Sequence, residues 1–218
     1  MIEAVLTTVK ILDAAEEVLR RFGPDKATVV DIARALGVTH GSVYRHFPSK
    51  AALRDAVAER WLGRVSAPLA AIVQSRDSAS RKLRRWLETL ASVKRRKALD
   101  DPELFATYHA IALESRDVVG AHVKSLIDQL TRIIEEGAEA GEFKAADAAT
   151  AARAVFDATA RFHNPAHASE WHSPSLAGEF EAVWSLVLAG LKADGSRDRG
   201  QVPSKKKGAR SPRAPSQR

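Results

Sequence analysis

The stretch from Thr28 to Pro48 constrains the fold more than any other part of this chain, because it encodes two short helices separated by a tight turn. Thr28 is a suitable N-cap residue, and Asp31, three residues later, can complete a capping box. Gly37 can end the first helix in a left-handed conformation, which glycine adopts without strain. Thr39 then begins the second helix. This order and spacing predict a helix-turn-helix unit.

The same region is strongly basic. Residues 32–54 contain Arg34, Arg45, Lys50 and Arg54 but no Asp or Glu, so the segment has a local charge of +4. A helix that enters the major groove of DNA must approach phosphates on both sides, so this charge favours DNA binding. The alternative is an ordinary basic helix on a protein surface.

The second short helix carries side chains suited to DNA contacts. Gly41 lets the backbone approach a phosphate closely, and the hydroxyls of Thr39, Ser42 and Tyr44 can hydrogen-bond to phosphate oxygens. Arg45 is the candidate base reader, because its planar guanidinium can pair with O6 and N7 of guanine.

Helical periodicity separates the inward and outward side chains of this segment. Val43 and Phe47 are four residues apart and are predicted to face the core, which leaves Tyr44 and Arg45 facing outward. His40 and His46 are two further donors that can reach bases or phosphates.

Three motifs in this region resemble the DNA-binding domain of the TetR family of bacterial transcription regulators: TVVDIA, GVTHGSVYRHF and PSK. The similarity covers about residues 8–62 without a gap. It implies an N-terminal three-helix domain that binds DNA. It also implies roles for single residues, with phosphates held by Thr28, Ser42, Tyr44 and Lys50, and with His40, Arg45 and His46 on the recognition helix.

The rest of the chain is also predicted to be helical, since apolar residues recur every three to four positions and alternating strand patterns are missing. A helix that begins after Ser49 is expected to reach about Val65, followed by a break around residues 68–80. Further helices are expected over residues 80–99, 101–115, 117–141, 145–164 and 173–192. The prediction is an all-α fold in which a helical bundle follows the helix-turn-helix domain.

Composition divides the chain into three expected parts: a DNA-binding domain over 1–65, an effector-binding and dimerisation domain over 66–192, and a basic tail over 193–218. The tail holds eight Lys or Arg and two Asp, so six of the seven net positive charges lie there. Its Pro, Ser, Gly and Lys content predicts disorder, and it serves either as a solubilising appendage or as a nonspecific phosphate contact. A second basic block, residues 93–100, is expected to be a solvated face, with a phosphate contact as the alternative.

The chain has no cysteine, which excludes disulfides and thiolate metal sites. Its first residues lack the pattern of a secretory signal, and no apolar run approaches the roughly 20 residues of a membrane span. A cytoplasmic protein is therefore expected.

The second expected domain, residues 66–192, is unusual in its histidines. The resemblance implies that this domain binds a small-molecule effector, and we expect aromatic rings and imidazoles to line the pocket. The candidates are Phe105, Tyr108, His109, His122, Phe156, Phe162 and His163. Imidazoles from three helices could instead bind a divalent metal, or could serve only as structural hydrogen-bonding groups. No contiguous metal-binding motif is present, so we predict neither a metal nor a cofactor.

The last helix carries a wide apolar stripe formed by Phe180, Val183, Trp184, Val187 and Leu188. The resemblance implies a homodimer, usually formed through the last two helices, and the stripe is a candidate for its interface. Core packing within one chain is the alternative. A two-fold dimer would place two recognition helices on a palindromic operator.

These features predict a ligand-responsive, homodimeric DNA-binding regulator, namely a repressor that a small-molecule effector releases from its operator. A regulator without a ligand is a second interpretation. The alternative from another class is a helical-bundle protein with an enzymatic or metal-sensing histidine site. The sequence has no nucleophile–base motif and no glycine-rich nucleotide loop, so we expect no enzymatic activity.

Overall fold

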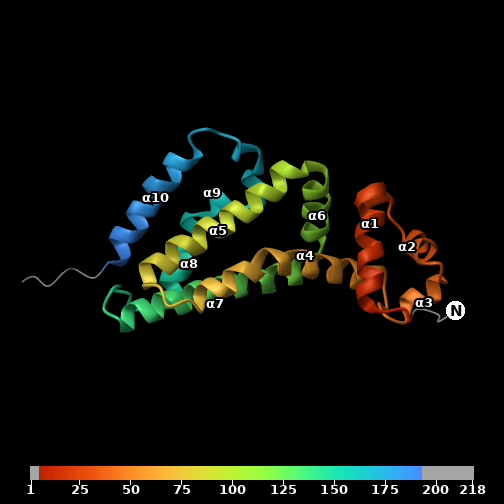
Figure 1. Cartoon of the computed structure of the whole chain (residues 1–218), viewed down its shortest axis with the longest axis horizontal. Helices are drawn as coiled ribbons and strands as arrows, with labels where there is room; N and C mark the ends of the chain where they lie inside the picture. The colour runs from red at the N-terminus through yellow and green to blue at the C-terminus, as the bar shows by residue number, and fades with distance from the viewer. Residues whose placement is uncertain (1–4, 193–218) are drawn as a thin grey trace, which may run out of the picture.

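Helices form nearly all of the regular structure in residues 5–192, the part of the chain that the computed structural model describes (Figure 1). The elements are α1 (Thr8–Lys26), α2 (Val29–Leu36), α3 (His40–Tyr44), α4 (Lys50–Val73), α5 (Ala79–Asp100), α6 (Pro102–Glu114), α7 (Arg116–Glu139), α8 (Ala148–Ala158), α9 (Ala160–His163), the 3-10 helix η1 (Pro165–Glu170) and α10 (Leu176–Leu191). The predicted all-α class is confirmed, with an N-terminal helix-turn-helix followed by a helical body.

The first three helices gather at one end of the molecule, and α4 leads from them into the body (Figure 1). Ile11 and Ala15 of α1, Ile32 of α2 and Val43 of α3 are buried in one cluster together with Val57 of α4. Because α3 contributes little more than Val43 to this cluster, most of its surface remains exposed.

The local signals that start and stop these helices act as predicted. The Thr28 hydroxyl accepts a hydrogen bond from the Asp31 N–H, and an Asp31 carboxylate oxygen accepts one from the Thr28 N–H, both at 3.2 Å. Gly37 ends α2 in the left-handed region, with a φ of 66°. Ser49 caps α4 by accepting a hydrogen bond from the Ala52 N–H at 3.0 Å.

Helix α4 is longer than the sequence predicted. It continues through Pro68 to Val73, so the expected break is confined to the few residues before α5. A proline inside a helix removes one backbone hydrogen bond. The burial of Val65 and Leu69 on either side of it, both with no exposed surface, holds the helix together.

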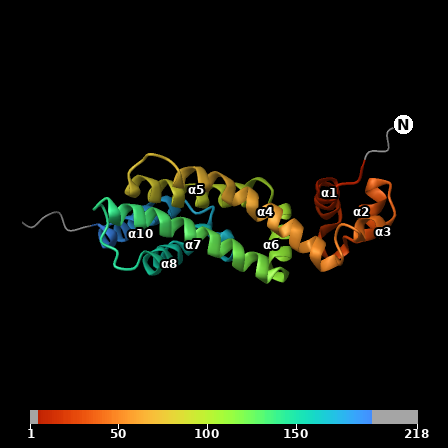
Figure 2. The same ribbon diagram turned by 90° about the horizontal axis from the view of Figure 1, so that it is seen from below.

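The body is built around α4, α5 and α7, with α4 and α5 on one side of α7 and α8 on the other (Figure 2). Leu83 and Leu90 of α5 and Leu126 and Leu130 of α7 have no exposed surface. Trp86 is also fully buried, and its indole N–H donates to the Gln129 side chain at 3.0 Å. These contacts form a second core, whereas the first extends from the N-terminal helices into the body through residues such as Trp61, Phe105 and Trp171.

The helix expected over residues 145–164 is divided into α8 and α9. Thr159 lies between them, and its hydroxyl donates to the carbonyl oxygen of Val155 at 2.8 Å. Hydroxyls that bond back to a preceding turn often bend a helix, which accounts for the break.

The apolar stripe considered for the dimer interface packs mostly against the chain itself, which favours the alternative of core packing within one chain. Trp184 is buried, and the other members are partly buried against the two cores: Phe180, Val183, Val187 and Leu188. These large side chains fill the space between α10 and the body. The outward face of α10 instead carries Leu186, which is 75% exposed.

None of the helices between residues 5 and 192 is long and apolar enough to cross a bilayer. The basic tail considered over residues 193–218 lies outside the described part of the chain.

Candidate nucleic-acid interface and ligand cavity

A chain of hydrogen bonds organises the exposed face of α3. The Thr39 hydroxyl accepts from the Ser42 N–H at 3.2 Å and lies 3.0 Å from the Ser42 hydroxyl. The Arg45 guanidinium then donates to the Ser42 hydroxyl at 3.1 Å. Val43 and Phe47 are buried, as predicted. The outward side chains are therefore held by one another and are open to a partner in solvent.

The other candidate DNA contacts lie around this chain of hydrogen bonds. His40 and Tyr44 are exposed, with their rings edge to face at a centroid distance of 6.3 Å. His46 and Lys50 are also exposed. A Cβ atom on Gly41 would have one neighbouring atom beyond its chain neighbours, at 3.8 Å. The backbone at Gly41 is thus accessible from outside.

The Thr28 hydroxyl, in contrast, already has a partner. It donates to the Asp31 carboxylate at 2.6 Å, and this bond is the main cause of the lowered pKa of Asp31. A phosphate bound at Thr28 would have to replace a negatively charged group as the acceptor.

Two of the four cations in residues 32–54 are neutralised within the chain. Arg34 pairs with Asp31 at 3.0 Å, and Arg54 pairs with Glu114 of α6 at 2.5 Å. Arg45 and Lys50 form no ion pair among residues 5–192. The free positive charge is therefore smaller than the sequence suggested and is concentrated on Arg45 and Lys50.

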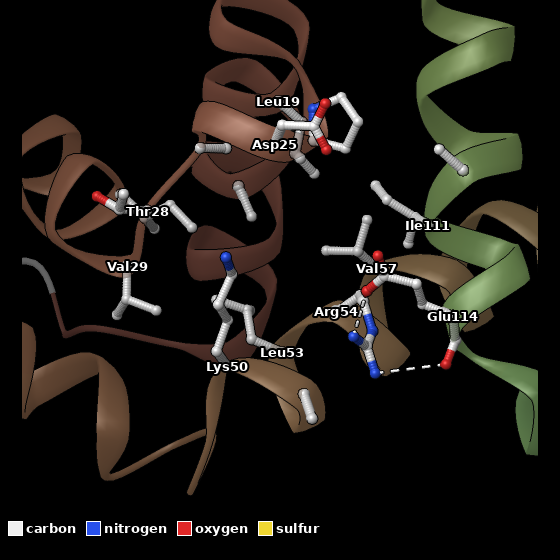
Figure 3. Close-up of a pocket in the computed structure, with 16 residues that line it drawn as sticks. Leu19, Asp25, Thr28, Val29, Lys50, Leu53, Arg54, Val57, Ile111 and Glu114 are labelled. Atoms are coloured by element: carbon white, nitrogen blue, oxygen red, sulfur yellow. Dashed lines mark hydrogen bonds and ion pairs between the residues drawn. The ribbon is translucent and has the colours of Figure 1, made fainter.

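A cavity of about 400 Å³ lies between α6 and the DNA-binding unit, which consists of α1 to α3 and the start of α4, and Figure 3 shows its lining. Dashed lines in Figure 3 join Arg54 to Glu114 at the edge of this cavity. Beside this pair, the Ser115 hydroxyl donates to the Asp55 carboxylate at 2.6 Å. These contacts connect the start of α4 to the end of α6.

A second cavity, of about 260 Å³, lies inside the body. Six helices, α4 to α9, contribute to its wall. Its lining includes Trp61 and Leu62 of α4, Lys94 of α5, His109 of α6, His122 of α7, Phe156 of α8 and His163 of α9. We call this space the body cavity.

The seven side chains expected to line one pocket are distributed over three hollows. The body cavity brings together His109, His122, Phe156 and His163. Phe105 and Tyr108 line a separate hollow next to α1, and Phe162 lines a groove between α5 and α10. The Trp61 ring stacks on Tyr108 at 5.1 Å and separates that hollow from the body cavity.

Two of the cavity histidines are neutral at physiological pH. Burial, with a smaller contribution from the charge of Lys94, lowers the pKa of both His122 and His163 to about 4. Nε2 of His163 lies 3.2 Å from the carbonyl oxygen of Phe156, which can only accept, so this nitrogen carries the proton. Nε2 of His122 is buried without a hydrogen-bond partner. Across residues 5–192, no group of three or more His, Asp or Glu side chains could hold a metal ion.

Sequence reasoning missed Lys94. The basic block at residues 93–100 was expected to be solvated or to contact phosphate, but Lys94 is only 8% exposed, so that prediction is wrong for this residue. A signal was present, because Lys94 continues the spacing of Leu83, Leu87 and Leu90 along the apolar face of α5.

The exposed recognition helix on a buried three-helix core defines this chain as a helix-turn-helix protein. Residues 11–57 match the family model described as bacterial regulatory proteins of the tetR family, and residues 79–184 match the Tetracyclin repressor-like C-terminal domain. The chain therefore belongs to the TetR family of DNA-binding transcription regulators.

Curated relatives match the DNA-binding region. The HTH-type transcriptional regulator YvdT of Bacillus subtilis is 47% identical over 53 residues, which cover 24% of this chain and 27% of that protein. TtgR of Pseudomonas putida is 42% identical over 55 residues, 25% of this chain and 26% of that protein. The chain thus matches only about a quarter of the length of these relatives.

A solved structure matches nearly the whole fold. SmeT, the repressor of the Stenotrophomonas maltophilia multidrug efflux pump SmeDEF, has a TM-score of 0.63 over 91% of this chain and 96% of its own, at 22% identity. At this identity the likeness concerns the fold.

Proposed function

We propose that this chain is a homodimeric, ligand-responsive repressor that a small molecule releases from its operator DNA. The observation that carries the proposal is the position of α6. His109 and Leu113 of α6 line the body cavity, whereas Ile111 and Glu114 of the same helix line the cavity next to the DNA-binding unit. One helix of 13 residues therefore contacts both places where binding is expected.

The contacts at the end of α6 offer a route from ligand to DNA. A ligand that displaces α6 would move Glu114 and Ser115, which are bonded to Arg54 and Asp55 at the start of α4. The DNA-binding unit would then change its orientation, and the spacing of two recognition helices in a dimer would no longer match the operator. The ligand shifts this equilibrium only as far as it prefers one conformer, and DNA opposes the ligand by the same factor.

We place the subunit interface on the outward faces of α8 and α10. Leu186 of α10 is exposed together with Ala182 and Ala189, which lie on the same side of the helix. Ala154 and Ala158 are exposed on α8. Small side chains around one large apolar residue suit the close approach of helices from a second subunit. A two-fold axis there would pair two recognition helices on a palindromic operator.

In this proposal, residues 1–65 bind DNA, residues 66–192 bind the effector and dimerise, and residues 193–218 add basic charge. The DNA contacts are Thr28, Thr39, His40, Gly41, Ser42, Tyr44, Arg45, His46 and Lys50. Arg45 reads a base, and most of the others position the helix on phosphates. The protein acts in the cytoplasm, where the bacterial chromosome lies, and catalyses no reaction.

The test is DNA binding measured by fluorescence anisotropy, with DNA from the region upstream of the protein's own gene and with salt varied stepwise. The full chain, a chain that ends at Lys192 and an Arg45→Ala variant are compared. We expect the shortened chain to keep selective binding. The Arg45→Ala variant should lose base preference. Binding that ignores sequence and disappears with residues 193–218 would contradict the proposal. Small molecules are then screened for release of the DNA.

A further inference from the structure

The body cavity contains a buried cation that no anion balances. Lys94 lines the cavity with more than nine-tenths of its surface buried. Within residues 5–192 its ammonium makes no ion pair and no hydrogen bond, and desolvation by burial lowers its pKa to about 8. Burying a charge without a partner is costly, so the residue is expected to serve a bound group.

The other buried lysine of the described residues shows what a structural lysine looks like in this fold. Lys82, 6% exposed, donates to Glu136 at 2.6 Å and to the carbonyl oxygen of Val73 at 3.0 Å. Both lysines lie on α5, yet only Lys82 is satisfied by the chain itself. The difference indicates that the partner of Lys94 comes from outside.

The groups around Lys94 leave its charge uncompensated. His122 and His163 are neutral at pH 7 because their pKa values lie near 4. Asp157 also borders the cavity, but it is exposed and pairs with Arg153 at 2.8 Å. Lys94 is therefore the one Lys or Arg of the cavity lining, and no carboxylate of residues 5–192 pairs with it.

The rest of the lining defines the shape of a ligand. Trp61, Leu62, Val123 and Phe156 make most of the wall apolar. Nε2 of His122 is buried without a partner, so it provides a second polar position. A volume of about 260 Å³, just below the roughly 300–1,000 Å³ of typical ligand pockets, suits a compact molecule.

We infer that the body cavity binds a small, largely apolar carboxylic acid, whose carboxylate pairs with Lys94 and hydrogen-bonds to His122. The acid is either a one- or two-ring aromatic or a short alkyl acid. The inference rests on the proposed function, since it names the chemical class of the effector.

The test is isothermal titration calorimetry on the full chain with benzoate, 1-naphthoate and octanoate, each compared with its primary amide. An amide keeps the shape of the acid but has no charge. Lys94→Met removes the ammonium and keeps most of the chain length. The matched control is Lys97→Met, one turn further along α5, at a residue that is outside the body cavity.

We expect at least one acid to bind about 10- to 100-fold more tightly than its amide, the range typical for a hydrogen bond to a charged group. Lys94→Met should lose this difference while its melting temperature rises, because an unpaired buried charge is removed. Lys97→Met should keep the difference. Equal binding of acid and amide, full acid affinity in Lys94→Met, or binding of none of the three acids would overturn the inference.

Operator release by the same compounds separates the two proposals. Acids that bind through Lys94 but leave DNA binding unchanged would support this inference and contradict the proposed function. Release of DNA by an uncharged compound, with no acid bound, would support the function and contradict the choice of ligand class.

Discussion

Gly41 and Gly137 illustrate how differently the two regions of this protein use space. A Cβ atom on Gly41 of α3 would have one neighbouring atom, at 3.8 Å, whereas on Gly137 of α7 it would lie 2.2 Å from the Phe143 ring and 2.8 Å from the Ala79 Cβ. The recognition helix leaves its surface open to a partner. In the body, side chains of the chain itself fill the space beside Gly137.

Polar groups differ in the same way between the two regions. In the DNA-binding unit, Thr39, Ser42 and Arg45 bond to one another at the surface. In the body, Lys94 and His122 are withdrawn from solvent and lack partners. A surface that carries ready donors can read a large, charged partner, whereas a partly open cavity with few polar groups can select a small molecule by its shape and charge.

The largest predicted effect comes from placing the same methyl group in both regions. Gly137→Ala should lower the free energy of unfolding by about 2–3 kcal/mol, because the ring of Phe143 must move. Gly41→Ala should leave stability unchanged or raise it by up to about 1 kcal/mol, and should weaken DNA binding. Urea unfolding and DNA anisotropy measure the two quantities. Equal stability losses in both variants would contradict the comparison.

The second prediction compares a positively charged side chain that forms no ion pair within residues 5–192 with one that does. Arg45→Ala should weaken operator binding by about 1–3 kcal/mol and relax the preference at one base pair. Arg34→Ala is the matched control, because Arg34 is paired with Asp31 and should contribute less. Selection of DNA sequences by both variants is the measurement. An unchanged preference in Arg45→Ala would remove this residue from base reading.

The sequence allowed the DNA-binding unit to be predicted closely because its determinants are local. The capping box at Thr28 and the turn at Gly37 depend on residues three or four positions apart, and the structure contains both. The inward positions of Val43 and Phe47 follow from helical periodicity in the same way.

The body was harder to predict because its features depend on distant partners. Pro68 remains within α4 because helices far along the chain pack against its neighbours. The spacing within α5 places Lys94 on the buried face, but the cavity beside it forms only where five other helices converge, and that convergence is not encoded locally. The same limit applies to α10, where the stripe around Trp184 meets the cores of its own chain.

The third prediction concerns the buried histidines of the body cavity and the effect of low pH on stability. The pKa values of His122 and His163 are about 4 in the folded protein, against 6.5 for a histidine in an unfolded chain, so the unfolded chain binds more protons between these values. Stability should therefore fall as the pH is lowered from 7 to 5, by on the order of 1–2 kcal/mol for each histidine. Urea unfolding at both pH values is the measurement.

Replacement of one histidine identifies the source of that loss. His122→Phe should remove about half of the pH-dependent loss, whereas His172→Asn, at an exposed position, should leave it unchanged. A loss of the same size in His122→Phe and in the unsubstituted chain would place the acid sensitivity elsewhere.

The smallest expected effect lies where the two regions meet. Arg54 and Glu114 are partly exposed, at 30% and 66% of their side-chain surfaces, so their pair should contribute only about 0.5–1 kcal/mol. A double-mutant cycle with Arg54→Gln and Glu114→Gln measures this coupling, and the exposed pair Arg153–Asp157 is the control. A coupling larger than the control would mean that the ion pair holds α6 to α4. A value no larger than the control would mean that the Ser115–Asp55 hydrogen bond and the apolar contacts of Ile111 hold α6 to α4 instead. Substitutions at those positions would then be the ones that uncouple ligand binding from DNA binding.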